Sequence, residues 1–266
     1  MVALILALAG TQSGKANLPV TTGDAELPKM MRIAPAGQQG WRRLPGAIGP
    51  SLVRMDRALN GLRGHQYRSR YLIETVKRER GIVNMLGYIA DDLQFRIEVP
   101  YIAGDPKSIS LETYVGDGWR SARLTTQGWG FHGRVRPRPN VLPSELLPQW
   151  PYQVGRVLYT ATASRKPGFA TLGLELGRAR ATSMLEQRTV SGVRQQRVLA
   201  QYRLNGRQCV LEIVVDPKSG LPLTIRSRRQ VGKAHPETAL WTAQWKPLPK
   251  SAIDPKWFKI PAKTSR

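Results

Sequence analysis

The sequence predicts a mainly β (α+β) protein built on a strongly curved antiparallel sheet, an incomplete β-barrel of about nine to eleven strands. Three observations predict this class. Apolar and polar residues alternate in many short segments, tight-turn motifs separate these segments, and the 266 residues include 25 Gly and 20 Pro. A sheet of that many strands curls or closes, so we expect one or a few helices to cover its concave side.

The N-terminal region is expected to precede the folded domain. Residues 1–16 contain an apolar run, Met1 to Ala9, that resembles a signal sequence. No basic residue precedes this run, which indicates an atypical or truncated signal, and we expect export to the periplasm or cell envelope. Residues 17–50 are rich in Pro and Gly and predict a flexible leader. Residues 51–262 then form a single β domain, followed by a short tail at 263–266.

The domain begins with a helix and continues in strands. Apolar residues at helical spacing predict a helix over 51–62 with Ser51 as its cap. Leu93 to Val99 alternates cleanly between apolar and polar residues, and Asp117-Gly118 predicts a hairpin. The strands expected in this half are 66–77, 81–90, 93–99, 108–115 and 119–125.

A Pro-rich insert near 127–151 interrupts the strand pattern, and its aromatic residues favour an ordered flap. Strands are then expected at 181–189, 197–204, 208–215, 221–230 and 240–246. The segment from Asp216 to Gly220, between the strands 208–215 and 221–230, predicts a tight turn. Pro217 sets its first corner, Asp216 accepts hydrogen bonds from turn amides, and Gly220 adopts a positive φ. Consecutive hairpins predict a meander.

Cys209 is the single cysteine, so the chain has no internal disulfide. It lies on the apolar side of its predicted strand and is expected to be a buried, inert thiol. The closing segment 253–261 is expected to turn and bury Trp257 and Phe258.

The formal net charge is +23, from 41 Lys and Arg against 18 Asp and Glu. Such a chain is attracted to polyanions. Most Arg residues alternate with apolar ones along predicted strands, however, which is typical of a solvated outer face.

Four motifs together resemble the LolA/LolB superfamily of periplasmic lipoprotein carriers and their outer-membrane lipoprotein-sorting relatives. They are Leu93-Gln-Phe-Arg-Ile97, Thr113-Tyr-Val-Gly-Asp-Gly-Trp119, Asp216-Pro-Lys-Ser-Gly-Leu-Pro222 and Ile253-Asp-Pro-Lys-Trp-Phe-Lys-Ile-Pro261. The resemblance spans about residues 51 to 262. It implies an incomplete barrel of about eleven strands, plugged by helices, with an apolar cavity for acyl chains. Membership of a fold does not by itself establish transport.

Signals for catalysis are weak. The three histidines, His65, His132 and His235, lie far apart in the sequence, and no nucleophile, metal-binding, P-loop or dinucleotide motif occurs. Aspartates beside Gly or Pro are explained by turn chemistry. We therefore expect that the protein is not an enzyme and that it has no catalytic residue, metal site or cofactor.

The predicted function is a non-enzymatic carrier or binder of lipid or lipoprotein acyl chains in the cell envelope. The protein is expected to be a monomer that contacts anionic membranes and envelope partner proteins, and nucleic acid is not expected as a partner. Two alternatives stay open: a polyanion-binding envelope protein, for anionic lipid, cell-wall polymer or nucleic acid, and a structural envelope protein without ligand. The candidate ligand-binding residues, on the apolar concave face, are Tyr71, Ile73, Met85, Phe95, Ile97, Val115, Leu211 and Ile213.

Overall fold

The computed structural model describes residues 27–74, 76–78, 80–91, 93–102, 109–125, 128–134, 169–204, 206–230 and 232–261. The chain divides into two units, 1–32 and 33–266. The described part of the first unit holds a short helix, α2 (Leu27–Met30). The predicted signal-like segment, most of the Pro-rich insert and the C-terminal tail lie outside the described residues.

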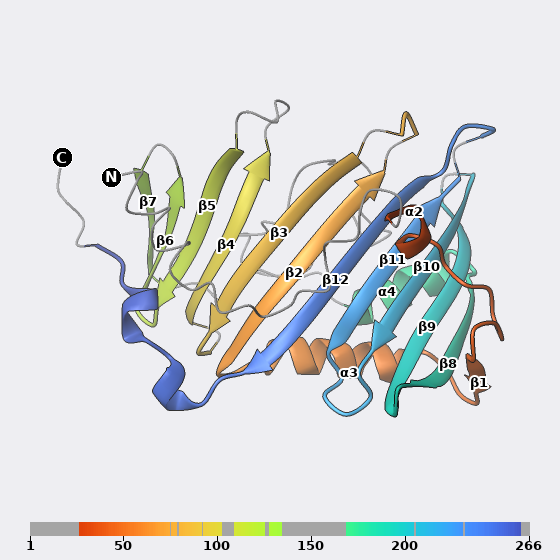
Figure 1. The fold of residues 1–266 in the computed structure, drawn as a ribbon, viewed down its shortest axis with the longest axis horizontal. Coiled ribbons are helices and arrows are strands. Elements are labelled where there is room, and N and C mark those ends of the chain that lie inside the picture. Colours follow the sequence, from red (N-terminus) through yellow and green to blue (C-terminus); the bar gives the residue numbers. More distant parts are fainter. Residues whose placement is uncertain are drawn as a thin grey trace. The chain divides into compact units, whose positions relative to one another are not determined.

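The second unit is built on one antiparallel sheet that contains twelve described strands (Figure 1). This confirms the predicted fold class. The strands are β1 (Arg42–Leu44), β2 (His65–Glu74), β3 (Arg80–Ile89), β4 (Gln94–Ile102), β5 (Ile109–Asp117), β6 (Arg120–Thr125), β7 (Gly128–Arg134), β8 (Thr182–Val190), β9 (Val193–Leu204), β10 (Arg207–Val215), β11 (Pro222–Arg229) and β12 (Glu237–Pro247).

The sheet consists of two meanders joined at its centre. Its order is β1-β8-β9-β10-β11-β12-β2-β3-β4-β5-β6-β7, so neighbours in sequence pair within β2–β7 and within β8–β12. The last strand, β12, pairs with β2, and Trp241 lies opposite Tyr71. The sheet is not closed, because β1 and β7 remain at its two edges. The meander was predicted; the pairing of β12 with β2 is a long-range contact that no local motif indicates.

Two helices pack on one side of the sheet, which we call the helix-facing side; the other is the opposite side. They are α3 (Gly49–Asn60) and α4 (Phe169–Arg178). Leu52 and Met55 of α3 and Leu172 of α4 are fully buried in the main apolar cluster, together with strand residues such as Ile213 and Trp241. The core of this unit therefore lies between the helices and the sheet.

Three local expectations need correction. The predicted cap Ser51 is inside α3, which begins at Gly49 after Ile48 and has no side-chain cap, because Pro50 already presets the first turn. Arg42–Leu44, within the predicted leader, forms β1 by pairing with β8. Gly128–Arg134, within the predicted insert, forms β7 against β6.

The turn between β10 and β11 has the predicted chemistry. Asp216 Oδ1 accepts a hydrogen bond from Lys218 N at 3.0 Å, and Oδ2 accepts one from Ser219 N at 3.1 Å. Gly220 has a φ of 77°. Burial alone would raise the pKa of Asp216, but the Ser219 hydroxyl and these two amides outweigh it and lower the pKa below its ordinary value.

The C-terminal segment returns to the opposite side of β3 and β4 through two single turns, η2 (Lys250–Ala252) and η3 (Pro255–Phe258). Trp257 stacks on Tyr88 of β3 with ring centroids 4.2 Å apart. Phe258 is buried, whereas Trp257 keeps partial exposure. The predicted burial of this aromatic pair is thus complete only for Phe258.

Candidate ligand-binding face

Most of the residues predicted to bind ligand share the helix-facing side of the sheet. Six are buried members of the main apolar cluster, and Ile73 is partly buried against it. The strand register places them on β2, β3, β4 and β10. The six buried residues are Tyr71, Met85, Phe95, Ile97, Leu211 and Ile213.

Val115 lies on the opposite side of the sheet, which corrects its expected inward position. It is paired with Arg96, and Tyr114 is paired with Ile97 on the helix-facing side. Val115 instead packs in a small cluster with Ala122 and Ile260. Tyr114 and Val115 are adjacent apolar residues, so the apolar pattern does not show which of them faces the helices. The pairing register of the strand decides this.

The described helices cover one half of the helix-facing side. In Figure 1 both α3 and α4 lie behind the half of the sheet formed by β8 to β12. Asp56 of α3 ties the pair together, because its Oδ1 accepts a hydrogen bond from Phe169 N at 2.7 Å. The apolar cluster nevertheless continues across β3, β4 and β5, where Met85, Ile97 and Tyr114 belong to it. The apolar layer is therefore broader than the two described helices.

An aromatic group at the centre of this side was not among the predicted site residues. Tyr67, Trp241 and Trp245 come from the paired strands β2 and β12. The ring centroids of Tyr67 and Trp245 are 5.5 Å apart, and those of Trp241 and Trp245 are 6.3 Å apart. Trp241 and Trp245 are four residues apart, which places them on one face of a strand and is the sequence signal for this group.

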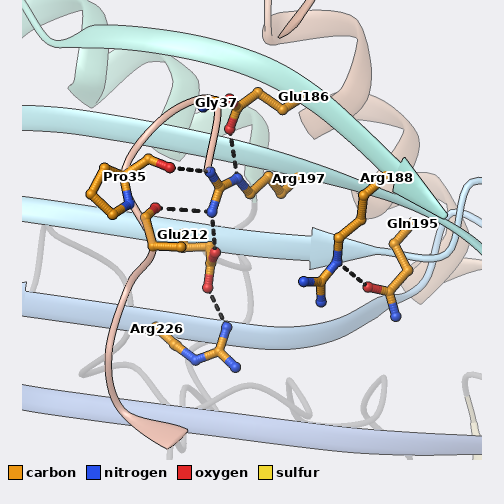
Figure 2. A network of polar contacts seen from close by, with 9 residues as sticks. Pro35, Gly37, Glu186, Arg188, Gln195, Arg197, Glu212 and Arg226 are labelled. Atoms are coloured by element: carbon orange, nitrogen blue, oxygen red, sulfur yellow. Dashed lines mark hydrogen bonds and ion pairs between the residues drawn. The ribbon is translucent and has the colours of Figure 1, made fainter. Parts of the chain in front are cut away.

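The opposite side carries a network of buried charges (Figure 2). Glu186, Arg197, Glu212 and Arg226 come from four adjacent strands, β8 to β11. Arg197 Nε donates to Glu186 Oε2 at 2.6 Å, and its Nη1 donates to Glu212 Oε1 at 2.7 Å. The second oxygen of Glu212 accepts from Arg226. Arg197 is fully buried, so the expectation that alternating arginines lie on a solvated face fails here.

The network fastens residues 33–41, which we call the strap, across the opposite side. Arg197 donates to the carbonyl oxygens of Ala34 at 3.0 Å and Pro35 at 2.9 Å. Gly37 N donates to the remaining Glu186 oxygen at 2.9 Å. The guanidinium groups of Arg188 and Arg197 lie over the Trp41 ring, 4.4 and 4.5 Å from its centroid. The carboxylates and Arg197 all use their polar atoms in these contacts, and through them the network attaches the strap to the sheet.

A small hollow of about 250 Å³ lies beside the start of α3. Arg54 donates two hydrogen bonds at its rim, to the carbonyl oxygens of Pro217 at 2.6 Å and Lys218 at 3.2 Å. The hollow is smaller than pockets that enclose drug-sized ligands. Its lining includes Pro50, Ser51, Arg54, Leu185, Gln196, Val215 and Gly220, none of them a predicted site residue.

Other chemistry is sparse in the described part of the chain. Its His, Cys, Asp and Glu residues form no group of three or more that could hold a metal ion. Cys209 is a buried thiol on the helix-facing side and forms no disulfide, as predicted. Burial, with Cys209 as the neighbouring group, raises the pKa of the Tyr202 phenol, which keeps it neutral. No described helix has the length and apolar character needed to cross a membrane.

Comparison with known proteins found no matching family model and no matching curated protein. Among solved structures, the chain is similar to MucB in its complex with MucA(peri), with a TM-score of 0.39 and 13% identity over 81% of this chain and 60% of that one. The chain therefore spans less than two thirds of MucB.

LprF from Mycobacterium bovis matches with a TM-score of 0.37 and 10% identity over 80% of this chain and 99% of that one. A LolA superfamily protein from Nitrosomonas europaea matches with a TM-score of 0.31 and 8% identity over 81% of this chain and 99% of that one. A LolA superfamily protein is thus among the similar structures, as the sequence resemblance predicted. The function proposed below rests on the geometry of the chain itself.

Proposed function

We propose that the protein is a non-enzymatic binder or carrier of acyl chains, from lipids or lipoproteins, in the cell envelope. The observation that supports this proposal is the continuous apolar layer on the helix-facing side. It runs from Val198 and Leu211 in one meander to Phe95 and Tyr114 in the other. The two described helices lie behind only the first of these regions (Figure 1).

Acyl chains need apolar area more than polar recognition. Each buried methylene contributes about 0.8 kcal/mol to binding, so a long chain gains affinity without a dense set of hydrogen bonds. A face of this composition, with Met85 and aromatic rings among its members, suits a flexible hydrocarbon guest. The proposed binding residues on this face are Tyr71, Ile73, Met85, Phe95, Ile97, Leu211 and Ile213.

The charge of the protein suits an envelope setting. A net charge of +23 attracts anionic membrane surfaces, from which a carrier would collect or to which it would deliver its ligand. We propose anionic membranes and envelope proteins as its partners. We also propose that the protein acts as a monomer.

The direct test is binding of a fluorescent fatty acid and of a triacylated peptide to the delipidated full-length protein. We expect saturable binding of both, with affinity rising about fourfold for each added methylene until the site is filled. Absence of saturable uptake at any chain length would reject the proposal.

Two matched variants locate the site. Ile97→Phe adds volume on the helix-facing side, so it should weaken binding of the longest chains more than that of short ones. Val115→Ile adds one methylene on the opposite side of the neighbouring strand and should leave the chain-length profile unchanged. Equal effects of the two variants would place the ligand somewhere other than the helix-facing side.

The same titrations decide between acyl binding and the polyanion alternative. Binding through the basic surface would weaken steeply as salt rises and would ignore chain length. Acyl binding should respond to chain length and change little with salt.

A further inference from the structure

Two buried hydrogen-bond donors at the centre of the helix-facing side have no acceptor among the described residues. They are the indole Nε1–H of Trp241 and the hydroxyl of Ser69. Trp241 is fully buried, and Ser69 is 4% exposed. A buried donor without a partner destabilises the folded state, because the group loses its hydrogen bonds to water without gaining another. Such groups are uncommon in native proteins, where an ordered water or a bound molecule usually supplies the missing acceptor.

The strand register brings the two donors together. Ser69 of β2 is paired with Ala243 of β12, and Tyr71 is paired with Trp241. Ser69 and Trp241 are therefore diagonal neighbours on one side of two adjacent strands, a spacing of roughly 7–8 Å between Cα atoms that long side chains bridge. This neighbouring placement is the basis for inferring one acceptor group that both donors share.

The neighbouring tryptophan provides an internal comparison. Trp245 lies on the same strand and the same side, but its Nε1 donates to the carbonyl oxygen of Pro222 at 2.8 Å. Its donor is satisfied within the protein. The open donor of Trp241 is therefore not shared by Trp245.

The charge and surroundings of the two donors favour a neutral acceptor over a charged one. Both are neutral, and they lie among aromatic rings and Met85. A carboxylate placed there would lose its hydration without gaining a counter-charge from either donor. The carbonyl oxygen of an ester or amide accepts the same hydrogen bonds at a smaller desolvation cost.

We propose that Trp241 and Ser69 bind the carbonyl oxygen of an ester- or amide-linked acyl chain. This inference rests on the proposed function and adds the chemical class of the ligand's polar end. It makes the protein selective for chains attached to a glycerol, sugar or peptide over free fatty acids.

The experiment compares methyl palmitate, hexadecyl methyl ether and palmitate on the full-length protein. The ether has a similar chain but no carbonyl oxygen. We expect the ester to bind about five- to tenfold more tightly than the ether, the gain of one or two buried hydrogen bonds. In nuclear magnetic resonance spectra of isotope-labelled indoles, the Trp241 Nε1–H signal should move with the ester and stay in place with the ether.

Three variants complete the test. Trp241→Phe and Ser69→Ala should each reduce the ratio of ester to ether affinity toward one. Trp245→Phe, whose donor serves Pro222, should leave that ratio unchanged. If Trp241→Phe does not fold, the affinity ratio of Ser69→Ala and the Trp241 indole signal of the unaltered protein still test the proposal.

The outcomes separate the two proposals. Equal binding of ester and ether with an unmoved Trp241 signal overturns the carbonyl site while leaving acyl binding intact. Preference for palmitate overturns the choice of a neutral acceptor. Failure of all three probes to bind overturns both proposals.

Discussion

The two sides of the sheet are built from the same strands but are stabilised by different interactions. On the helix-facing side, β8 to β11 present apolar residues such as Val198, Ile213 and Ile225 to α3 and α4. On the opposite side, the same strands present Arg197 and Glu212, buried beneath the strap. One side is held by packing and the other by paired charges.

The difference matters because the two kinds of burial respond differently to change. An apolar layer tolerates a guest or a substituted side chain of similar volume. A buried ion pair does not, because removing one partner leaves an uncompensated charge. This difference is why the ligand-binding proposal concerns the helix-facing side, whereas the opposite side holds the strap.

The largest effect should come from Arg197→Met. It leaves Glu186 and Glu212 buried without their shared cation, so we expect a loss of about 3–5 kcal/mol in the free energy of unfolding. Chemical denaturation measures this. Arg188→Met is the control, because Arg188 is half-buried, donates a hydrogen bond to the neutral Gln195 and contacts Trp41. A loss below about 1 kcal/mol for Arg197→Met would show that the strap is not held by charge.

An intermediate effect is expected from Gly87→Ala on the helix-facing side. The new Cβ would lie 1.8 Å from Cε1 of Tyr67, so the ring must move. We expect a loss of about 1–3 kcal/mol in the free energy of unfolding, with a changed near-ultraviolet signal from the aromatic group.

Gly177→Ala in α4 is the matched control for this substitution, because no atom lies within 4 Å of its new Cβ. It should be neutral or slightly stabilising. If Gly87→Ala behaves in the same way, the helix-facing side is more adaptable than its packing indicates.

The smallest effect should come from Asp216→Asn, in the turn that sets the register of β10 and β11 and so decides which side each residue faces. We expect a loss of about 1 kcal/mol near neutral pH. The folded-state pKa of Asp216 is lowered, so its contribution is present above the unfolded pKa of about 3.9 and disappears as pH falls through the folded pKa. Unfolding curves of both proteins should therefore converge in acid; a difference that persists there would contradict the assignment.

Local sequence signals were sufficient for most of the strands and their turns, but not for β1 and β7. Alternation placed Phe95 and Ile97 on one side, and the chemistry of Asp216 and Gly220 placed a turn, because both depend only on near neighbours. Long-range pairing was beyond such signals. The contact of β12 with β2, the side on which Val115 lies and the strap all depend on which distant strands meet.

The candidate site shows the same division. Apolar periodicity was enough to identify most of the helix-facing residues. The general expectation of a solvated arginine face does not hold for Arg197, because nothing in its own strand shows that Ala34 and Pro35 will cover it. The open donors of Trp241 and Ser69 likewise follow from what the fold leaves without an acceptor, which composition does not reveal.

The pairing of β12 with β2 also determines when the whole sheet can form during folding. β2 lies early in the sequence, yet one of its two partners is β12, the last described strand. Until that strand has emerged, β2 exposes a free edge of backbone donors and acceptors, a hazard for aggregation. Contacts this far apart in sequence form slowly, so we expect the chain to need protection during synthesis, and truncations that remove β12 to leave two unjoined halves.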